Sequence, residues 1–101
     1  PTWQVFAHVW ITYPADNATV AQAVTFGGDA IVFEGTVTWQ ILMNGDVLKD
    51  GHTQAAEAGP AQSPWQETVT LAPGTYTIRA FEVSAKDGSA TYVDDKVITV
   101  K

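Results

Sequence analysis

Two glutamates in this 101-residue chain lie within or beside apolar, strand-like stretches, where a carboxylate can become a general acid or base. Glu34 directly follows the apolar run "AIVF", and Glu82 lies inside "TYTIRAFEV". A glycosidase would need the two carboxylates a few ångströms apart, and nothing in the sequence places them together. Gly35 comes immediately after Glu34. We therefore interpret this pair as a strand-to-strand corner, in which the carboxylate accepts hydrogen bonds from turn N–H groups or meets water.

Glu82 is harder to place, because both alternating faces of its stretch carry apolar residues. A β-bulge would resolve the phase. An inward-pointing Glu82 would need a partner, since burying an unpaired carboxylate is costly, and Arg79 lies on the opposite face. We expect Glu82 or Ser84 to brace the backbone of a neighbouring loop. Asp87 and Gly88 then form a turn.

Other catalytic or metal-binding motifs are not recognisable in the sequence. His8 and His52 lack the spacing of metal ligands, the serines lack a nucleophile-elbow context, and there are no cysteines. The calcium candidates are Asp87, Asp94 and Asp95, which fall near one predicted hairpin, although paired aspartates also protect edge strands from pairing. We predict that the protein is not an enzyme and uses no cofactor.

Short strands must position these side chains. Runs rich in Val, Ile, Thr and aromatic residues alternate with Gly, Pro, Asn and Asp. The first run covers residues 5–13 and ends at "PADNAT". The others cover residues 30–33, 36–43, 46–51, 64–71, 75–85 and 90–100. Asn44-Gly45 predicts a tight hairpin, and residues 52–58 read as a loop or a poor edge strand. The pattern predicts an all-β, antiparallel immunoglobulin-like β-sandwich of about seven strands, with a small barrel as the competing architecture.

Composition narrows the functional classes. The chain carries 11 acidic and 5 basic residues, a formal charge of −6, so binding to the phosphate backbone of a nucleic acid is disfavoured. No apolar run approaches the roughly 18 residues of a membrane helix. The sequence begins at Pro1 without a signal peptide, and we expect it to be a piece of a larger protein whose targeting segment lies elsewhere.

Four tryptophans in so short a chain are the main candidates for ligand contact. Trp39 alternates with Val37 and Ile41 and is the predicted core tryptophan between two sheets. The remaining aromatic candidates for contact with a protein or a sugar ring are Trp3, Phe6, Trp10 and Trp65, and the alternative for each is packing under loops.

Several phrases taken in order resemble one known family. They are "YPADNATV", "GGDAIVFEGTVTWQIL", "NGDVLKDG", "PGTYTIRAFEVSAKDGSA" and "VITV". This series resembles the Gmad2 family, the immunoglobulin-like domain of bacterial spore-germination and related envelope proteins. The resemblance runs from about residue 11 to residue 101, leaving residues 1–10 as an N-terminal extension of a single domain over residues 1–101. It implies an extracytoplasmic β-sandwich, often attached to a lipoprotein, and no established activity.

Together these observations predict a non-catalytic accessory module of a bacterial envelope or secreted protein. Its expected partner is another protein or a neighbouring domain of the same chain. The alternative is a carbohydrate-binding module for cell-wall glycan that uses exposed tryptophans. Residues 1–10, as a strand at a sheet edge, are a further candidate for contact with a partner or a second copy.

Overall fold

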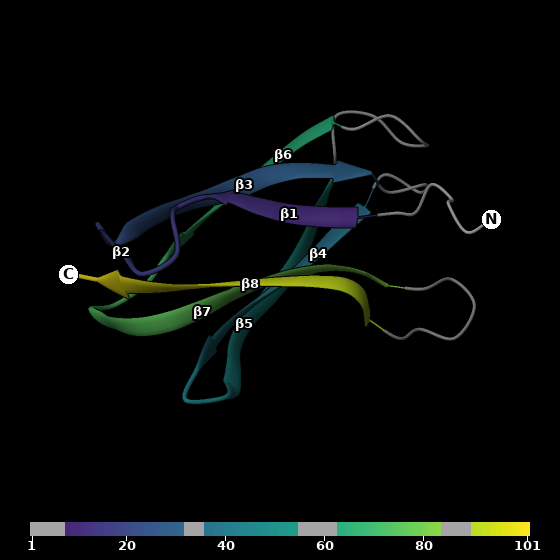
Figure 1. The fold of residues 1–101 in the computed structure, drawn as a ribbon. Helices are drawn as coiled ribbons and strands as arrows, with labels where there is room; N and C mark the ends of the chain where they lie inside the picture. The colour runs from purple at the N-terminus through teal and green to yellow at the C-terminus, as the bar shows by residue number, and fades with distance from the viewer. Residues whose placement is uncertain (1–7, 32–35, 55–62, 84–89) are drawn as a thin grey trace.

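A computed structural model describes residues 8–31, 36–54, 63–83 and 90–101 of the chain (Figure 1). The described residues form eight strands, and none of them is in a helix long and apolar enough to cross a membrane. The strands are β1 (His8–Tyr13), β2 (Ala18–Val20), β3 (Ala23–Ile31), β4 (Thr36–Met43), β5 (Asp46–Gln54), β6 (Ser63–Thr70), β7 (Gly74–Val83) and β8 (Ala90–Val100).

The strands form two sheets that pack face to face (Figure 1). One sheet has the order β1-β3-β6, and the other has the order β2-β8-β7-β4-β5. All neighbouring strands are antiparallel except β2, which pairs parallel with β8. Two antiparallel sheets with these crossovers are the arrangement of an immunoglobulin-like sandwich, as the sequence predicts. The strand beyond the predicted seven is β2, in the stretch where the sequence shows only a break.

Apolar side chains from both sheets meet between them. The core consists of Val9, Ile11, Val24, Phe26, Ala30, Val37, Trp39, Ile41, Trp65, Leu71, Tyr76, Ile78, Ala80, Ile98 and Val100. Phe26 lies between Trp39 and Trp65 with edge-to-face geometry, at ring-centroid distances of 5.4 and 6.1 Å. Such aromatic pairs add to the burial energy of the rings. The predicted core position of Trp39 is confirmed.

Two irregularities change the alternation of buried side chains in the larger sheet. One falls between Ile41 and Leu42 in the β4–β5 pairing, and Leu42 is buried in addition to Ile41. The other falls between Ala80 and Glu82 in the β7–β8 pairing. This second irregularity is the bulge that the mixed pattern of β7 requires.

Turn residues set where the strands begin and end. Asn44 and Gly45 both have positive φ, 54° and 86°, as a two-residue hairpin turn requires, and they join β4 to β5. Gly27 and Gly28 lie within β3, where only glycine fits because a Cβ at either one would collide with the backbone of β6 or β1. The Tyr76 hydroxyl donates to the Ala72 carbonyl at 2.7 Å and fixes the start of β7.

Candidate functional site

Of the two glutamates that raise the question of catalysis, Glu82 lies within the described residues and Glu34 does not. Glu34 and Gly35 lie outside the described residues, as do Ser84, Asp87 and Gly88. Glu82 lies on β7 at the bulge and is half-buried, so its strand position matches the expected irregularity. The separation between the Glu34 and Glu82 carboxylates therefore lies outside the described part of the chain.

The two described calcium candidates point in different directions. The Asp94 carboxylate accepts from the backbone N–H of Ile11 at 2.8 Å and lies 3.7 Å from the Lys96 ammonium. The Asp95 carboxylate instead pairs with Arg79. Adjacent residues of a strand face opposite sides of the sheet, so Asp94 and Asp95 do not converge on one ion. No cluster of three His, Asp or Glu side chains suited to a metal occurs in the described ranges.

Arg79 and Asp95 form a bidentate ion pair across β7 and β8. The two nitrogen–oxygen distances are 2.8 and 3.1 Å. The hydrogen bond to Asp95 raises the pKa of Arg79 above its ordinary value. Both side chains are more than a third exposed, so solvent screening leaves the pair a contribution of about 1 kcal/mol or less. Because the guanidinium is charged far beyond neutral pH in any case, the raised pKa of Arg79 adds no pH dependence of stability between neutral and mildly basic conditions.

The tryptophans expected to face solvent differ among themselves. Trp65 is 2% exposed, and its indole N–H donates to the Asp29 carbonyl at 3.1 Å, so the expectation of an outward-facing Trp65 is wrong. The physical reason is that Trp65 lies on the inner face of β6, where its ring packs edge-to-face against Phe26 in the core. Trp10 is 36% exposed, whereas Trp3 and Phe6 lie outside the described residues.

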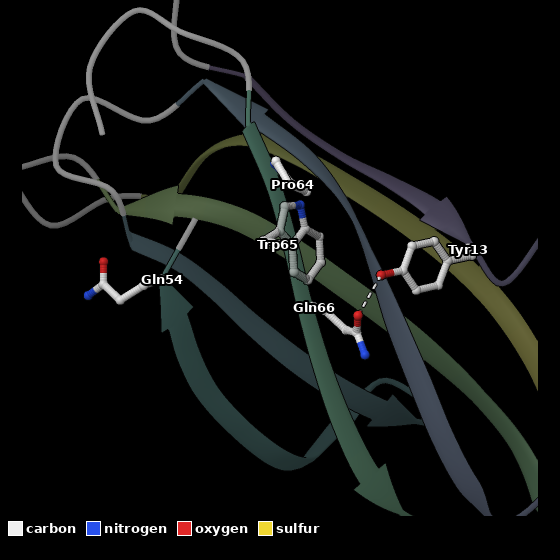
Figure 2. A pocket seen from close by; sticks show the side chains of 5 residues that line it. All are labelled: Tyr13, Gln54, Pro64, Trp65 and Gln66. Atoms are coloured by element: carbon white, nitrogen blue, oxygen red, sulfur yellow. Dashed lines mark hydrogen bonds between the residues drawn. The ribbon is translucent and has the colours of Figure 1, made fainter. Parts of the chain in front are cut away.

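A shallow pocket opens beside strand β6 (Figure 2). Its volume is about 270 Å³, and its lining residues are Tyr13, Gln54, Pro64, Trp65 and Gln66. Tyr13 and Gln54 lie on the two sides of β6, and the Tyr13 hydroxyl donates to the Gln66 carboxamide at 3.4 Å (Figure 2). Its described lining offers two aromatic rings, those of Tyr13 and Trp65, together with two carboxamides and no charged group. It has the chemistry to contact a small neutral polar molecule, and the described lining contains no carboxylate, imidazole or amine.

Side chains close the backbone edge of the smaller sheet on both sides. On the β1 side, the N–H of Ile11 is held by Asp94 of β8. On the β6 side, Pro64 has no N–H, the Gln66 carbonyl accepts from the Thr53 hydroxyl at 3.3 Å, and the Thr68 N–H donates to the Glu67 carboxylate at 3.2 Å. Capped or proline-bearing edges resist pairing with another chain.

On the β8 side of the larger sheet, the last residues of the strand are closed as well. The strand β2 covers the end of β8, and the N–H and C=O of Val97 are held by the Asp16 carboxylate and the Asn17 N–H at 2.8 and 2.6 Å. These two contacts and that of Asp94 join residues roughly eighty positions apart, so no local pattern announces them. The sequence analysis missed this use of the carboxylates. The only available signal is an aspartate just outside an apolar run.

Strand β5 is the remaining edge. It is the last strand of the larger sheet, is nine residues long, and is exposed over most of its length. Among the described residues, the side-chain hydrogen bonds of β5 lie near its end, between Thr53 and Gln66 of β6 and between Gln54 and Thr36 of β4. Within the described ranges, no side chain caps the backbone of residues 47–52 on the side away from β4. The segment predicted as a loop or poor edge strand therefore begins as the last residues of a long edge strand.

Within the described residues, fold and edges together define an immunoglobulin-like β-sandwich with capped groups on three sheet edges and an open edge at β5. The family of the immunoglobulin-like domain of bacterial spore germination, Gmad2, matches residues 8–89. The chain belongs to this family. No match was found among the curated proteins.

Proposed function

We propose that this domain is a non-catalytic accessory module of a bacterial envelope or secreted protein, and that it acts by contacting another protein or a neighbouring domain. Membership of a family named for bacterial spore germination supports a place outside the cytoplasm. The observation that carries the proposal is the selective closing of sheet edges. Three are held by the chain's own groups, and the long strand β5 is left open.

The described carboxylates support the same proposal. Asp16, Glu67 and Asp94 accept from backbone N–H groups, and Asp95 pairs with Arg79. Catalysis by paired carboxylates needs two such groups converging on a cleft. Asp16, Asp94 and Asp95 instead join separate parts of the chain, and Glu67 caps an N–H of its own strand.

The test is direct binding with purified components. Candidate partners from an envelope extract are captured on the immobilised domain, identified, purified, and titrated against the free domain by calorimetry. Saturable binding with one-to-one stoichiometry is the expected result. Failure of every purified candidate to bind, with the domain shown to be folded, would contradict the proposal.

The second candidate is a module for cell-wall glycan, and the pocket beside β6 is the observation that favours it. Carboxamides form hydrogen bonds with sugar hydroxyls, and an aromatic ring packs against a sugar face. Gln54, Gln66 and Tyr13 provide these groups, and of the expected tryptophans Trp65 also lines the pocket. Co-sedimentation with purified cell-wall sacculi tests this candidate. Binding that Gln66→Ala abolishes would support it, and binding unchanged by that substitution would exclude this pocket.

A further inference from the structure

The backbone of β5 points its free groups away from the sheet in a regular pattern. The Asn44-Gly45 turn is closed by Met43 and Asp46, and residue pairs in an antiparallel ladder alternate between hydrogen-bonded and non-hydrogen-bonded. Counting along β4 from this turn, the backbone N–H and C=O groups of Leu42, Gln40 and Thr38 point toward β7. The residues paired with them on β5 are Val47, Asp50 and His52. The N–H and C=O groups of these three residues therefore point outward, away from β4.

The side chains beside those groups have a definite chemistry. Val47 and Leu48 are 46% and 53% exposed, which makes them the apolar part of the edge. Asp46 and Asp50 are exposed, and neither takes part in the two ion pairs formed within the described ranges. Lys49 is the one cation of β5, and the whole chain has a formal charge of −6. The edge is therefore acidic overall with one apolar end.

We propose that β5 accepts an extended segment of a partner protein as the sixth strand of the β2-β8-β7-β4-β5 sheet. The segment carries lysine or arginine opposite Asp50 and an apolar residue opposite Val47. Backbone hydrogen bonds give such a segment its affinity, and the side-chain pairs give the interaction its specificity. A second copy of this chain is opposed by the repulsion of two bodies of charge −6. This inference rests on the proposed function and names the β5 edge as the surface that contacts the partner.

The test uses synthetic strands as probes. One peptide has nine residues, the length of β5, with alternating threonine and lysine, a single valine and blocked termini. Its twin has glutamate in place of lysine. Titration into the isotopically labelled domain is followed by amide chemical shifts and hydrogen exchange. The lysine peptide is expected to slow exchange at Val47, Asp50 and His52 and to bind at least about tenfold more tightly than the glutamate peptide. Raising the salt from about 0.05 to about 0.5 M should weaken it.

Variants separate the edge from general charge attraction. Asp50→Asn and Thr99→Lys each raise the net charge by one, but Thr99 lies on β8, away from β5. Asp50→Asn should weaken the binding of the lysine peptide, and Thr99→Lys should leave its affinity within about twofold of the wild-type value. Asp50→Lys should reverse the preference between the peptides. His52→Pro removes an outward N–H that β4 does not use, and should block binding while the domain stays folded.

Several results would overturn the proposal. They are shifts confined to the pocket beside β6, equal affinity for the two peptides, and an Asp50→Lys variant without reversed preference. Slowed exchange at β5 that rises with protein concentration and accompanies a dimer mass would assign the edge to a second copy and reject a separate partner. If a purified natural partner binds equally well to the wild type and to both Asp50→Lys and His52→Pro, the contact function stands and the β5 assignment fails.

Discussion

At the scale of single residues, several carboxylates of this domain accept hydrogen bonds from backbone N–H groups. Asp94 is the clearest case, because its oxygen accepts from the Ile11 N–H of a strand in the opposite sheet. A carboxylate just outside an apolar run can thus hold two sheets together without any catalytic role. The adjacent Asp95 pairs with Arg79 on the solvent side, where such a pair contributes little.

These two aspartates predict different costs of substitution. Asp94→Ala leaves the Ile11 N–H without its acceptor and should lower the free energy of unfolding by about 1–3 kcal/mol. Asp95→Ala removes an exposed ion pair and should lower it by about 1 kcal/mol or less. Chemical denaturation of both variants measures the difference. Equal losses would mean that the Asp94 contact does not hold β1 in solution.

Trp39 predicts the largest single effect. It is 7% exposed, packs edge-to-face on Phe26, and lies over Gly51, where a Cβ would come within 2.6 Å of the ring. Trp39→Ala should lower the free energy of unfolding by about 3–5 kcal/mol, measured by denaturant melts. Trp39→Phe should cost less, because the indole N–H has no hydrogen-bond partner in the structure and its removal leaves no polar group unsatisfied. A loss below about 1 kcal/mol for Trp39→Ala would place the ring on the surface.

At the scale of strands, the sequence predicts those strands and turns that neighbouring residues determine. The alternation around Trp39 and the Asn44-Gly45 turn predict β4, the hairpin and β5 correctly. The same alternation fails at Leu42, because a bulge changes which side chains point inward and pairing across strands sets its position. For Trp65 the alternation does not say which face of β6 is the inner one, and pairing with β3 puts Trp65 on the buried face. The short strand β2 and the caps from Asp16 and Asp94 depend on contacts across most of the chain, so no window of sequence contains them.

The hairpin between β4 and β5 gives a prediction at this scale. Gly45 has a φ of +86°, and nothing lies within 4 Å of where its Cβ would be. Gly45→Ala should therefore cost about 1–2 kcal/mol of folding free energy through backbone conformation alone. Asn44→Gly, at the neighbouring left-handed position, should cost little and serves as the control. Equal stability of Gly45→Ala and the wild type would show that the turn is not the one described.

At the scale of the whole molecule, the domain is a small sandwich whose described carboxylates are dispersed. This arrangement and the family it belongs to support a module that makes contacts. We predict that the purified domain does not hydrolyse chromogenic glycosides, esters or peptides. Glu34→Gln and Glu82→Gln should accordingly change no turnover. Reproducible hydrolysis that disappears with either substitution would reject the non-catalytic proposal.

The central claim is that three sheet edges are closed and that β5 is open, and amide hydrogen exchange of the monomeric domain tests it most directly. The N–H groups of Ile11 and Val97, held by Asp94 and Asp16, should exchange slowly although neither bonds to the next strand of its sheet. Those of Val47, Asp50 and His52 should exchange orders of magnitude faster, near the rates of an unstructured chain. If these three β5 amides are instead as protected as those of Ile11 and Val97, the edge is already occupied and the account is wrong.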